Sequence, residues 1–176
     1  MKTNLKQVAL AAIAVLAAAV AFAGDMQKGN GPADPRFERL KALAGTWTGK
    51  AADGNGPAQD TTVEYKVVGA GSAVVETLFP GKPHEMISVY HMDGAELVMT
   101  HYCAAGNQPH LKARGGGPGS IDFEFAGGSN MKPADMHMHS LVITFVDADH
   151  IRSVWSSQKD GKPAGSAVFE LSRKKS

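Results

Sequence analysis

The feature that most constrains the fold is a series of short segments in which apolar and polar residues alternate. Alternation with a period of two places successive side chains on opposite faces and indicates half-buried β-strands. The segments between them, among them "GAGS", "PGKP", "MDGA" and "KDGKP", supply the Gly, Pro and Asp residues that tight turns require. Because every connection is short, neighbouring strands are expected to pair in chain order as an antiparallel meander.

We predict ten strands, and the even number favours a closed barrel. In a ten-stranded meander the last strand runs antiparallel to the first, so the two can pair and remove both exposed edges. Without the sixth segment, "PHLKAR", they would run parallel and this closure would fail. The predicted strands are Thr46–Ala51, Thr61–Val68, Ala73–Phe79, His84–His91, Glu96–Cys103, Pro109–Arg114, Ser120–Ala126, His137–Val146, Ile151–Gln158 and Gly165–Ser172.

One short helix is predicted before the first strand. Asp34 can cap it and Pro35 suits its first position. Phe37, Leu40 and Leu43 then recur at helical spacing, and Gly45 ends the pattern. The predicted fold class is therefore all-β: a closed antiparallel meander β-barrel of about ten strands with a short N-terminal helix at the closed end.

The first 23 residues have the pattern of a signal peptide. Lys2 and Lys6 precede the apolar run from Val8 to Val20, and Ala21-Phe22-Ala23 is a small-x-small cleavage site. The run is shorter than the roughly 20 residues that a membrane span needs. We therefore expect residues 1–23 to be removed, 24–33 to be a linker and 34–176 to form the barrel of a periplasmic or secreted protein.

Charge and cysteine content narrow the function classes further. Without the signal peptide the chain has 16 basic and 17 acidic residues, which argues against nucleic acid as a partner. Cys103 is the single cysteine, so an exported chain has no internal disulfide. It is either a small buried residue, a metal ligand or a reactive thiol. The oligomeric state is left open.

The turn "MDGA" suggests which face of two strands lines the barrel. A two-residue Asp93-Gly94 turn would pair Met92 with Ala95. Counting outward, one face then has no formal charge, whereas the other has two carboxylates. We expect the uncharged face to point inward: His84, Met86, Ser88, Tyr90, Leu97, Met99, His101 and Cys103.

The stretch "HYCAAGNQPH" is then a strand end turning over at the open mouth of the barrel. Alternating strand directions bring five of the seven histidines to that rim: His84, His101, His110, His137 and His139. Imidazole, thiol and thioether groups are ligands that copper and zinc prefer. The candidate metal ligands are His84, His101, Cys103 and His139. The alternative is that these residues are polar only because the mouth is exposed to water.

A barrel mouth is also where small molecules enter. The candidate ligand-binding residues are Tyr65, Phe79, Met86, Tyr90, Met99, His101 and Trp155, within a lining that adds Val63, Val67, Leu141, Ile143 and Phe145. Alternation with Val75 and Phe79 predicts that Glu76 points outward. No catalytic residue is assigned, because the chain lacks Gly-x-Ser-x-Gly, His-Glu-x-x-His and phosphate-loop motifs.

The segment Gly45-Thr46-Trp47-Thr48-Gly49 resembles the Gly-x-Trp signature of the lipocalin and fatty-acid-binding (calycin) superfamily. The resemblance implies that Arg173, at the end of the last strand, packs over Trp47. The segment is also similar to the start of nitrobindin-type haem barrels, although Ala51 replaces their next glycine. "HEM…HYCAAGNQP" resembles secreted bacterial lipocalin-like proteins of unknown function, which implies a fold but no substrate.

Three functions follow as hypotheses. The first is an exported barrel that holds a small, partly apolar ligand and has a histidine-rich mouth. The second is a haem barrel, in which His101 or His139 reaches the iron, or a copper or zinc barrel. The third is an enzyme that uses the mouth histidines in a reaction that the sequence does not identify.

Overall fold

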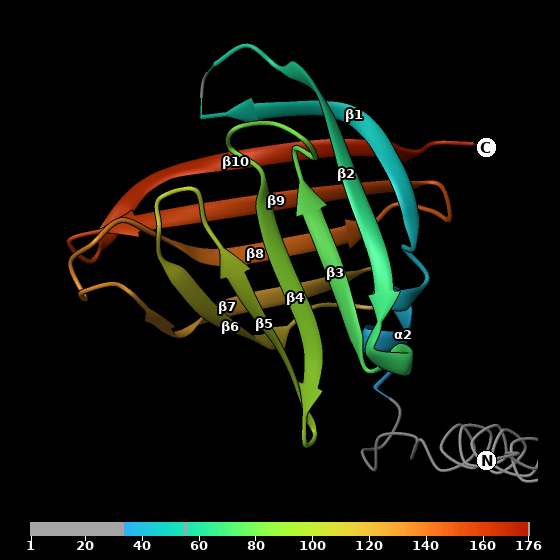
Figure 1. The fold of residues 1–176 in the computed structure, drawn as a ribbon, viewed down its shortest axis with the longest axis horizontal. Coiled ribbons are helices and arrows are strands. Elements are labelled where there is room, and N and C mark those ends of the chain that lie inside the picture. Colours follow the sequence, from blue (N-terminus) through green and yellow to red (C-terminus); the bar gives the residue numbers. More distant parts are fainter. Residues whose placement is uncertain (1–33, 55, 176) are drawn as a thin grey trace, which may run out of the picture. The chain divides into compact units, whose positions relative to one another are not determined.

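The computed structural model describes residues 34–54 and 56–175, so the predicted signal peptide and linker lie outside the described residues. Within these residues, one α-helix precedes the strands, and a short 3-10 helix joins β2 to β3 (Figure 1). The elements are α2 (Pro35–Lys41), β1 (Gly45–Asp53), β2 (Gln59–Val68), η1 (Gly69–Gly71), β3 (Ala73–Leu78), β4 (Met86–Asp93), β5 (Glu96–Tyr102), β6 (Gln108–Gly115), β7 (Ser120–Ser129), β8 (His137–Phe145), β9 (His150–Lys159) and β10 (Lys162–Arg173).

The strands form a closed antiparallel barrel, which confirms the predicted fold class. Each strand pairs with its neighbours in the chain, and β1 pairs with β10. In Figure 1, β2, β3 and β4 cross in front of β8, β9 and β10 at a steep angle. The sixth predicted strand is β6, which pairs with both β5 and β7. The prediction of ten strands, which the antiparallel pairing of the first and last strands supported, is confirmed.

The register between β4 and β5 differs from the prediction. Asp93 pairs with Glu96, so Gly94 and Ala95 are the central residues of the turn, one position later than expected. Gly94 has φ of 59°, and a glycine with positive φ fits the first central position of such a turn. The pairing shifts by two residues, so Ser88 lies opposite His101 while the inward face stays the same.

The end of the barrel next to the helix is closed by Trp47 and Arg173. The Arg173 guanidinium lies 4.4 Å from the centroid of the Trp47 ring, as the calycin resemblance implied. It also donates to the backbone oxygens of Ala42 and Ala44, at 2.9 and 3.0 Å. The Trp47 indole donates to Leu43 O at 2.8 Å. This network ties the chain after α2 to the last strand.

The two glycines of the Gly-Thr-Trp-Thr-Gly segment have separate structural roles. Gly45 has φ of 130°, a backbone conformation that side chains disfavour. Gly49 lies opposite Leu171, where β10 approaches closely. A Cβ atom on Gly49 would lie 1.9 Å from the backbone oxygen of Glu170. The segment is thus explained by the closure of the barrel, with no need for a ligand.

Replacing Gly49 by alanine is expected to destabilise the protein by about 2 kcal/mol, because β1 and β10 must separate to admit the methyl group. Gly117→Ala is the matched control, since nothing lies within 4 Å of a Cβ built there. Urea denaturation of both variants measures the difference. Equal stability of the two variants would contradict the close approach of β10.

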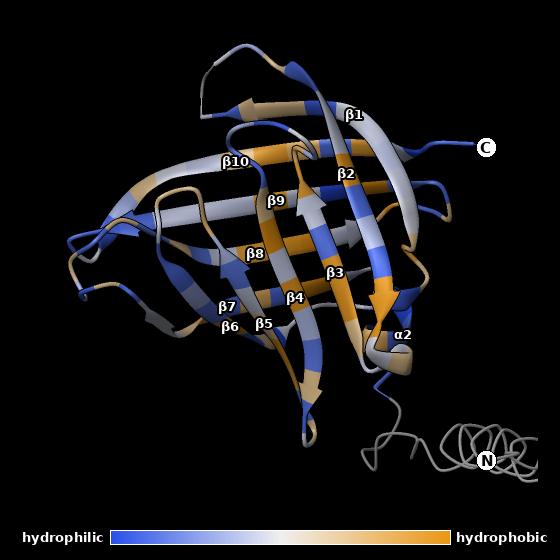
Figure 2. Ribbon diagram, viewed as in Figure 1, coloured by the Kyte–Doolittle hydropathy of each residue, from blue (hydrophilic) through white to orange (hydrophobic). Residues whose placement is uncertain are grey.

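The hydrophobic core fills the barrel and extends to the inner side of α2. Figure 2 shows orange and blue bands alternating along β2, β3 and β4, as expected for strands with one face inward. Phe37 and Leu40 of the helix are buried with Trp47. Among the described residues, no helix is long and apolar enough to cross a membrane.

Candidate functional site

A buried carboxyl group, Glu76, lies inside the barrel, and this corrects the prediction that it points outward. Glu76 is 1% exposed and shares one face of β3 with the buried Val74 and Leu78. The prediction failed because it took Phe79 to continue the strand. Phe79 instead follows the end of β3 and has φ of 57°, so it no longer obeys the alternation.

Two tyrosines hold Glu76 from the neighbouring strands. Tyr65 on β2 and Tyr90 on β4 each donate a hydroxyl hydrogen bond of 2.7 Å, one to each carboxyl oxygen. Burial raises the pKa of Glu76, and the hydroxyl donors oppose that rise because they favour the charged form. Burial and the adjacent carboxyl raise the pKa of both tyrosines well above their usual range, so both hydroxyls stay protonated.

A serine connects this group to a buried histidine. The Ser88 hydroxyl lies 3.0 Å from His101 Nδ1 and near enough to Glu76 to help hold its pKa down. A hydroxyl that donates to the carboxyl accepts from Nδ1–H, so this network assigns the proton of His101 to Nδ1. Burial lowers the pKa of His101 to about 4, and the ring is neutral at neutral pH.

His101 meets Trp155 across the barrel interior. Their ring centroids are 4.7 Å apart, although β5 and β9 are not neighbours in the sheet. His101 Nε2 and Trp155 Nε1 are both buried and have no hydrogen-bond partner. Elsewhere on β9 and β2, the hydroxyl oxygens of Ser153 and Thr61 are also buried without a partner. A buried polar group without a partner costs roughly 1–3 kcal/mol, so these atoms mark a place where a partner is missing.

The inner face becomes apolar and partly exposed toward the open end. We call this region the open-end wall; its residues are partly exposed yet pack against the core, and they are Ala51, Phe79, Met86, Met138 and Ala167. Met86 precedes Ser88 by two positions on β4, and Met138 pairs with Ser157 on β9. Met86 and Met138 therefore lie one layer closer to the open end than the His101–Trp155 contact, whereas Ala167 lies directly opposite Trp155.

Two predicted metal ligands lie near the mouth but outside the polar interior. His84 is exposed in the loop between β3 and β4, where its ring lies 4.7 Å from that of Phe79. Cys103 follows the end of β5, and its backbone N–H donates to Asn107 O across a turn. Neither residue is in a strand, so strand alternation does not set their directions.

Two further histidines of the rim, His137 and His139, pack against one phenylalanine. The rings of His137 and His139 lie 4.4 and 5.4 Å from Phe125. The register between β8 and β9 shifts between Met138 and Ser140, which brings both imidazoles to the same ring. His137 Nε2 lies 3.2 Å from His139 Nδ1, and burial together with His137 lowers the pKa of His139.

These positions do not bring the four predicted metal ligands to one point. Within residues 34–54 and 56–175, no three His, Cys, Asp or Glu side chains are grouped so that they could hold a metal ion. His101, one of the two predicted haem ligands, has its Nε2 covered and its ring in contact with Trp155. His139, the other, has its Nδ1 directed toward His137 and its Nε2 outside that contact.

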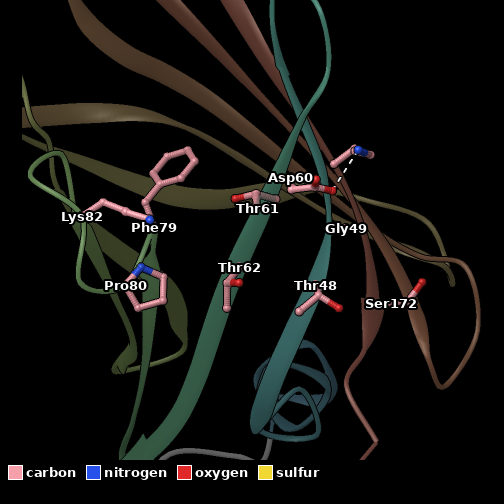
Figure 3. Close-up of a pocket in the computed structure, with 10 residues that line it drawn as sticks. Thr48, Gly49, Asp60, Thr61, Thr62, Phe79, Pro80, Lys82 and Ser172 are labelled. Atoms are coloured by element: carbon pink, nitrogen blue, oxygen red, sulfur yellow. Dashed lines mark ion pairs between the residues drawn. The ribbon is translucent and has the colours of Figure 1, made fainter.

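A groove of about 660 Å³ lies over the outer side of β1 and β2, and Phe79 of the open-end wall also lines it. Figure 3 shows Thr48 and Thr62 there, beside Pro80 and Lys82 of the loop after β3. The dashed line marks the ion pair between Lys50 and Asp60, 2.8 Å long. Apart from Thr61, the groove contains none of the buried polar atoms that lack a partner, so we place the candidate site inside the barrel.

The predicted ligand-binding residues divide between the two parts of this interior. Phe79 and Met86 belong to the open-end wall, whereas the other five are buried below it: Tyr65, Tyr90, Met99, His101 and Trp155. No functional role was predicted from the sequence for Glu76, Ser153 or Thr61. One signal could have identified Glu76, because it lies between two strands with inward tyrosines.

Fold and site together define a closed ten-stranded antiparallel barrel with buried polar groups in its interior and apolar side chains at its open end. The chain is similar to Rv2717c from M. tuberculosis, whose crystal structure aligns with a TM-score of 0.51 and 20% identity. The alignment covers 81% of this chain and 99% of that chain. At this identity the similarity shows the fold alone. No family model and no curated protein matches the chain.

Proposed function

We propose that this protein is an exported, lipocalin-like barrel that binds a small, partly apolar molecule inside its open end. The observation that carries the proposal is the open-end wall. Its five apolar side chains are partly exposed on or next to the inner face, and the inward side chains of Tyr65, Tyr90, Met99 and Trp155 next to them are buried. Small-molecule sites are concave, mostly apolar and supplied with a few polar groups, and the mouths of β-barrels are a common location.

The wall combines two properties that suit a ligand. Ala51 and Ala167 present small side chains from β1 and β10. Met86 and Met138 are flexible and polarizable, so they can repack around different shapes. The buried polar atoms below the wall provide the few polar groups that would fix the orientation of a bound molecule.

Filling the wall is expected to weaken binding. Ala167 lies opposite Trp155 and faces inward, so Ala167→Phe places a ring in the space proposed for the ligand. Ala52 faces outward next to Ala51, and Ala52→Phe is the matched control. With Nile red as a neutral apolar probe, we expect fluorescence enhancement by the wild type and by Ala52→Phe. Ala167→Phe should bind about tenfold more weakly, the effect of roughly 1.4 kcal/mol of crowding.

Two results would contradict the proposal. The first is a wild-type protein that does not enhance the fluorescence of Nile red. The second is an equal loss in both variants, which would place the probe on the outer surface.

A further inference from the structure

The buried polar layer below Met86 and Met138, which we call the base of the site, offers one hydrogen-bond acceptor and one donor in two rings that contact each other, and both are unused. We assign the His101 proton to Nδ1, because Ser88 can then accept from it while its own hydroxyl proton points to Glu76, and Nε2 then presents a lone pair. The Trp155 indole nitrogen is a donor only. Both atoms are buried without a partner, in rings whose centroids are 4.7 Å apart.

The charge of the interior excludes an anionic partner for this pair. Thr61, Glu76, Ser88, His101, Asn107, His137, Ser153 and Ser157 are the buried polar or charged residues of the described chain. No lysine or arginine is among them, and burial keeps His101 uncharged at neutral pH. A carboxylate placed there would have no cation to offset its desolvation, and Glu76 would repel it whenever that group is ionised.

We propose that the base binds a neutral head group that both donates and accepts a hydrogen bond, as an alcohol does. This inference rests on the proposed function, in which the open-end wall holds the apolar part of the same molecule. The head group donates to His101 Nε2 and accepts from Trp155 Nε1. The ligand class is thus a small neutral amphiphile such as a medium-chain alcohol.

Entry of the head group requires a side chain to move, since neither ring nitrogen is reached by solvent. Met86 and Met138 occupy the inner face one layer closer to the mouth. Three rotatable bonds allow each methionine to turn aside without a change in the backbone. The gain for the protein is that two buried atoms acquire the partners they lack.

Three probes of equal chain length test the head group: octan-1-ol, octan-2-one and octanoate. Calorimetry at neutral pH should show that the alcohol binds about tenfold more tightly than the ketone, because the ketone leaves His101 Nε2 unpaired. Octanoate should bind more weakly than the alcohol by at least the same factor. Equal binding of alcohol and ketone, or tightest binding of octanoate, would overturn the proposal.

Two variants separate the roles of the rings. His101→Phe should remove the preference for the alcohol over the ketone, whereas His91→Phe on the outer face of β4 should retain it. Trp155→Phe keeps an aromatic ring but loses the donor, so it should weaken both probes about tenfold. A His101→Phe protein that still prefers the alcohol would contradict the assignment. If neither Nile red nor any of the three probes binds the wild type, the proposed function itself fails.

Discussion

Replacing Glu76 by alanine is expected to lower the free energy of unfolding by about 4 kcal/mol. The substitution leaves two buried tyrosine hydroxyls without a hydrogen-bond partner and opens a cavity. The hydroxyls of Tyr65 and Tyr90 both donate to this one carboxyl group. Removing the carboxyl relieves the cost of burying it, but that relief is smaller because two donors already compensate the burial. Urea denaturation of the two proteins measures the loss.

A triple variant separates the effect of the unpaired hydroxyls on stability from the effect of the cavity. Tyr65→Phe, Glu76→Leu and Tyr90→Phe together remove every polar atom of the group and keep most of its volume. A well-packed apolar replacement of a buried polar group is often neutral or stabilising. The triple variant should therefore regain most of the stability that Glu76→Ala loses. Equal destabilisation of the triple and single variants would show that the tyrosine hydroxyls are not the cause.

Acidification is expected to destabilise the protein through His101. Burial lowers its pKa in the folded state to about 4, from the ordinary histidine value of 6.5. A base whose pKa is depressed by folding contributes stability above its unfolded pKa and loses it as the pH falls through the folded pKa. Between pH 7.5 and 4 this loss approaches about 3 kcal/mol, since one pKa unit corresponds to about 1.4 kcal/mol.

Glu76 acts in the opposite direction, because its pKa is raised and its protonation favours the folded state. The contribution of His101 is therefore obtained by difference, from the pH dependence of unfolding in the wild type and in His101→Phe. Stability should fall more steeply with acid in the wild type. His91→Phe, which carries the same substitution on the outer face, should behave as the wild type does. Parallel pH profiles for all three proteins would show that His101 is not buried in its neutral form.

Local chemistry was enough to predict the architecture of the barrel. Turn residues mark the ends of all ten strands, and the antiparallel closure of β1 with β10 follows from the even number. The contact between Trp47 and Arg173 followed from the calycin resemblance. These features depend on short segments or on topology, so they do not require knowledge of packing.

The interior site was less predictable because it depends on where strands stop and shift. Val74 and Val75 give β3 an apolar residue on each face, and only the break at Phe79 decides that Glu76 points inward. Similarly, the shift between Met138 and Ser140 alters the positions of His137 and His139 in a way that simple alternation does not reveal. The contact between His101 and Trp155 joins opposite walls, and no local pattern contains it.

The two tryptophans allow a direct test of whether a ligand reaches the buried interior beside His101 and Trp155. Trp47 Nε1 is hydrogen-bonded to Leu43 O at the closed end, whereas Trp155 Nε1 is unpaired in the interior. Nitrogen-15 correlation spectra, with the indole signals assigned through Trp155→Phe, report on both groups as octan-1-ol is added. We expect the Trp155 indole signal to shift to lower field and the Trp47 signal to stay unchanged. Shifts confined to the backbone amides of Thr48 and Thr62 in the outer groove, with no change at Trp155, would contradict it.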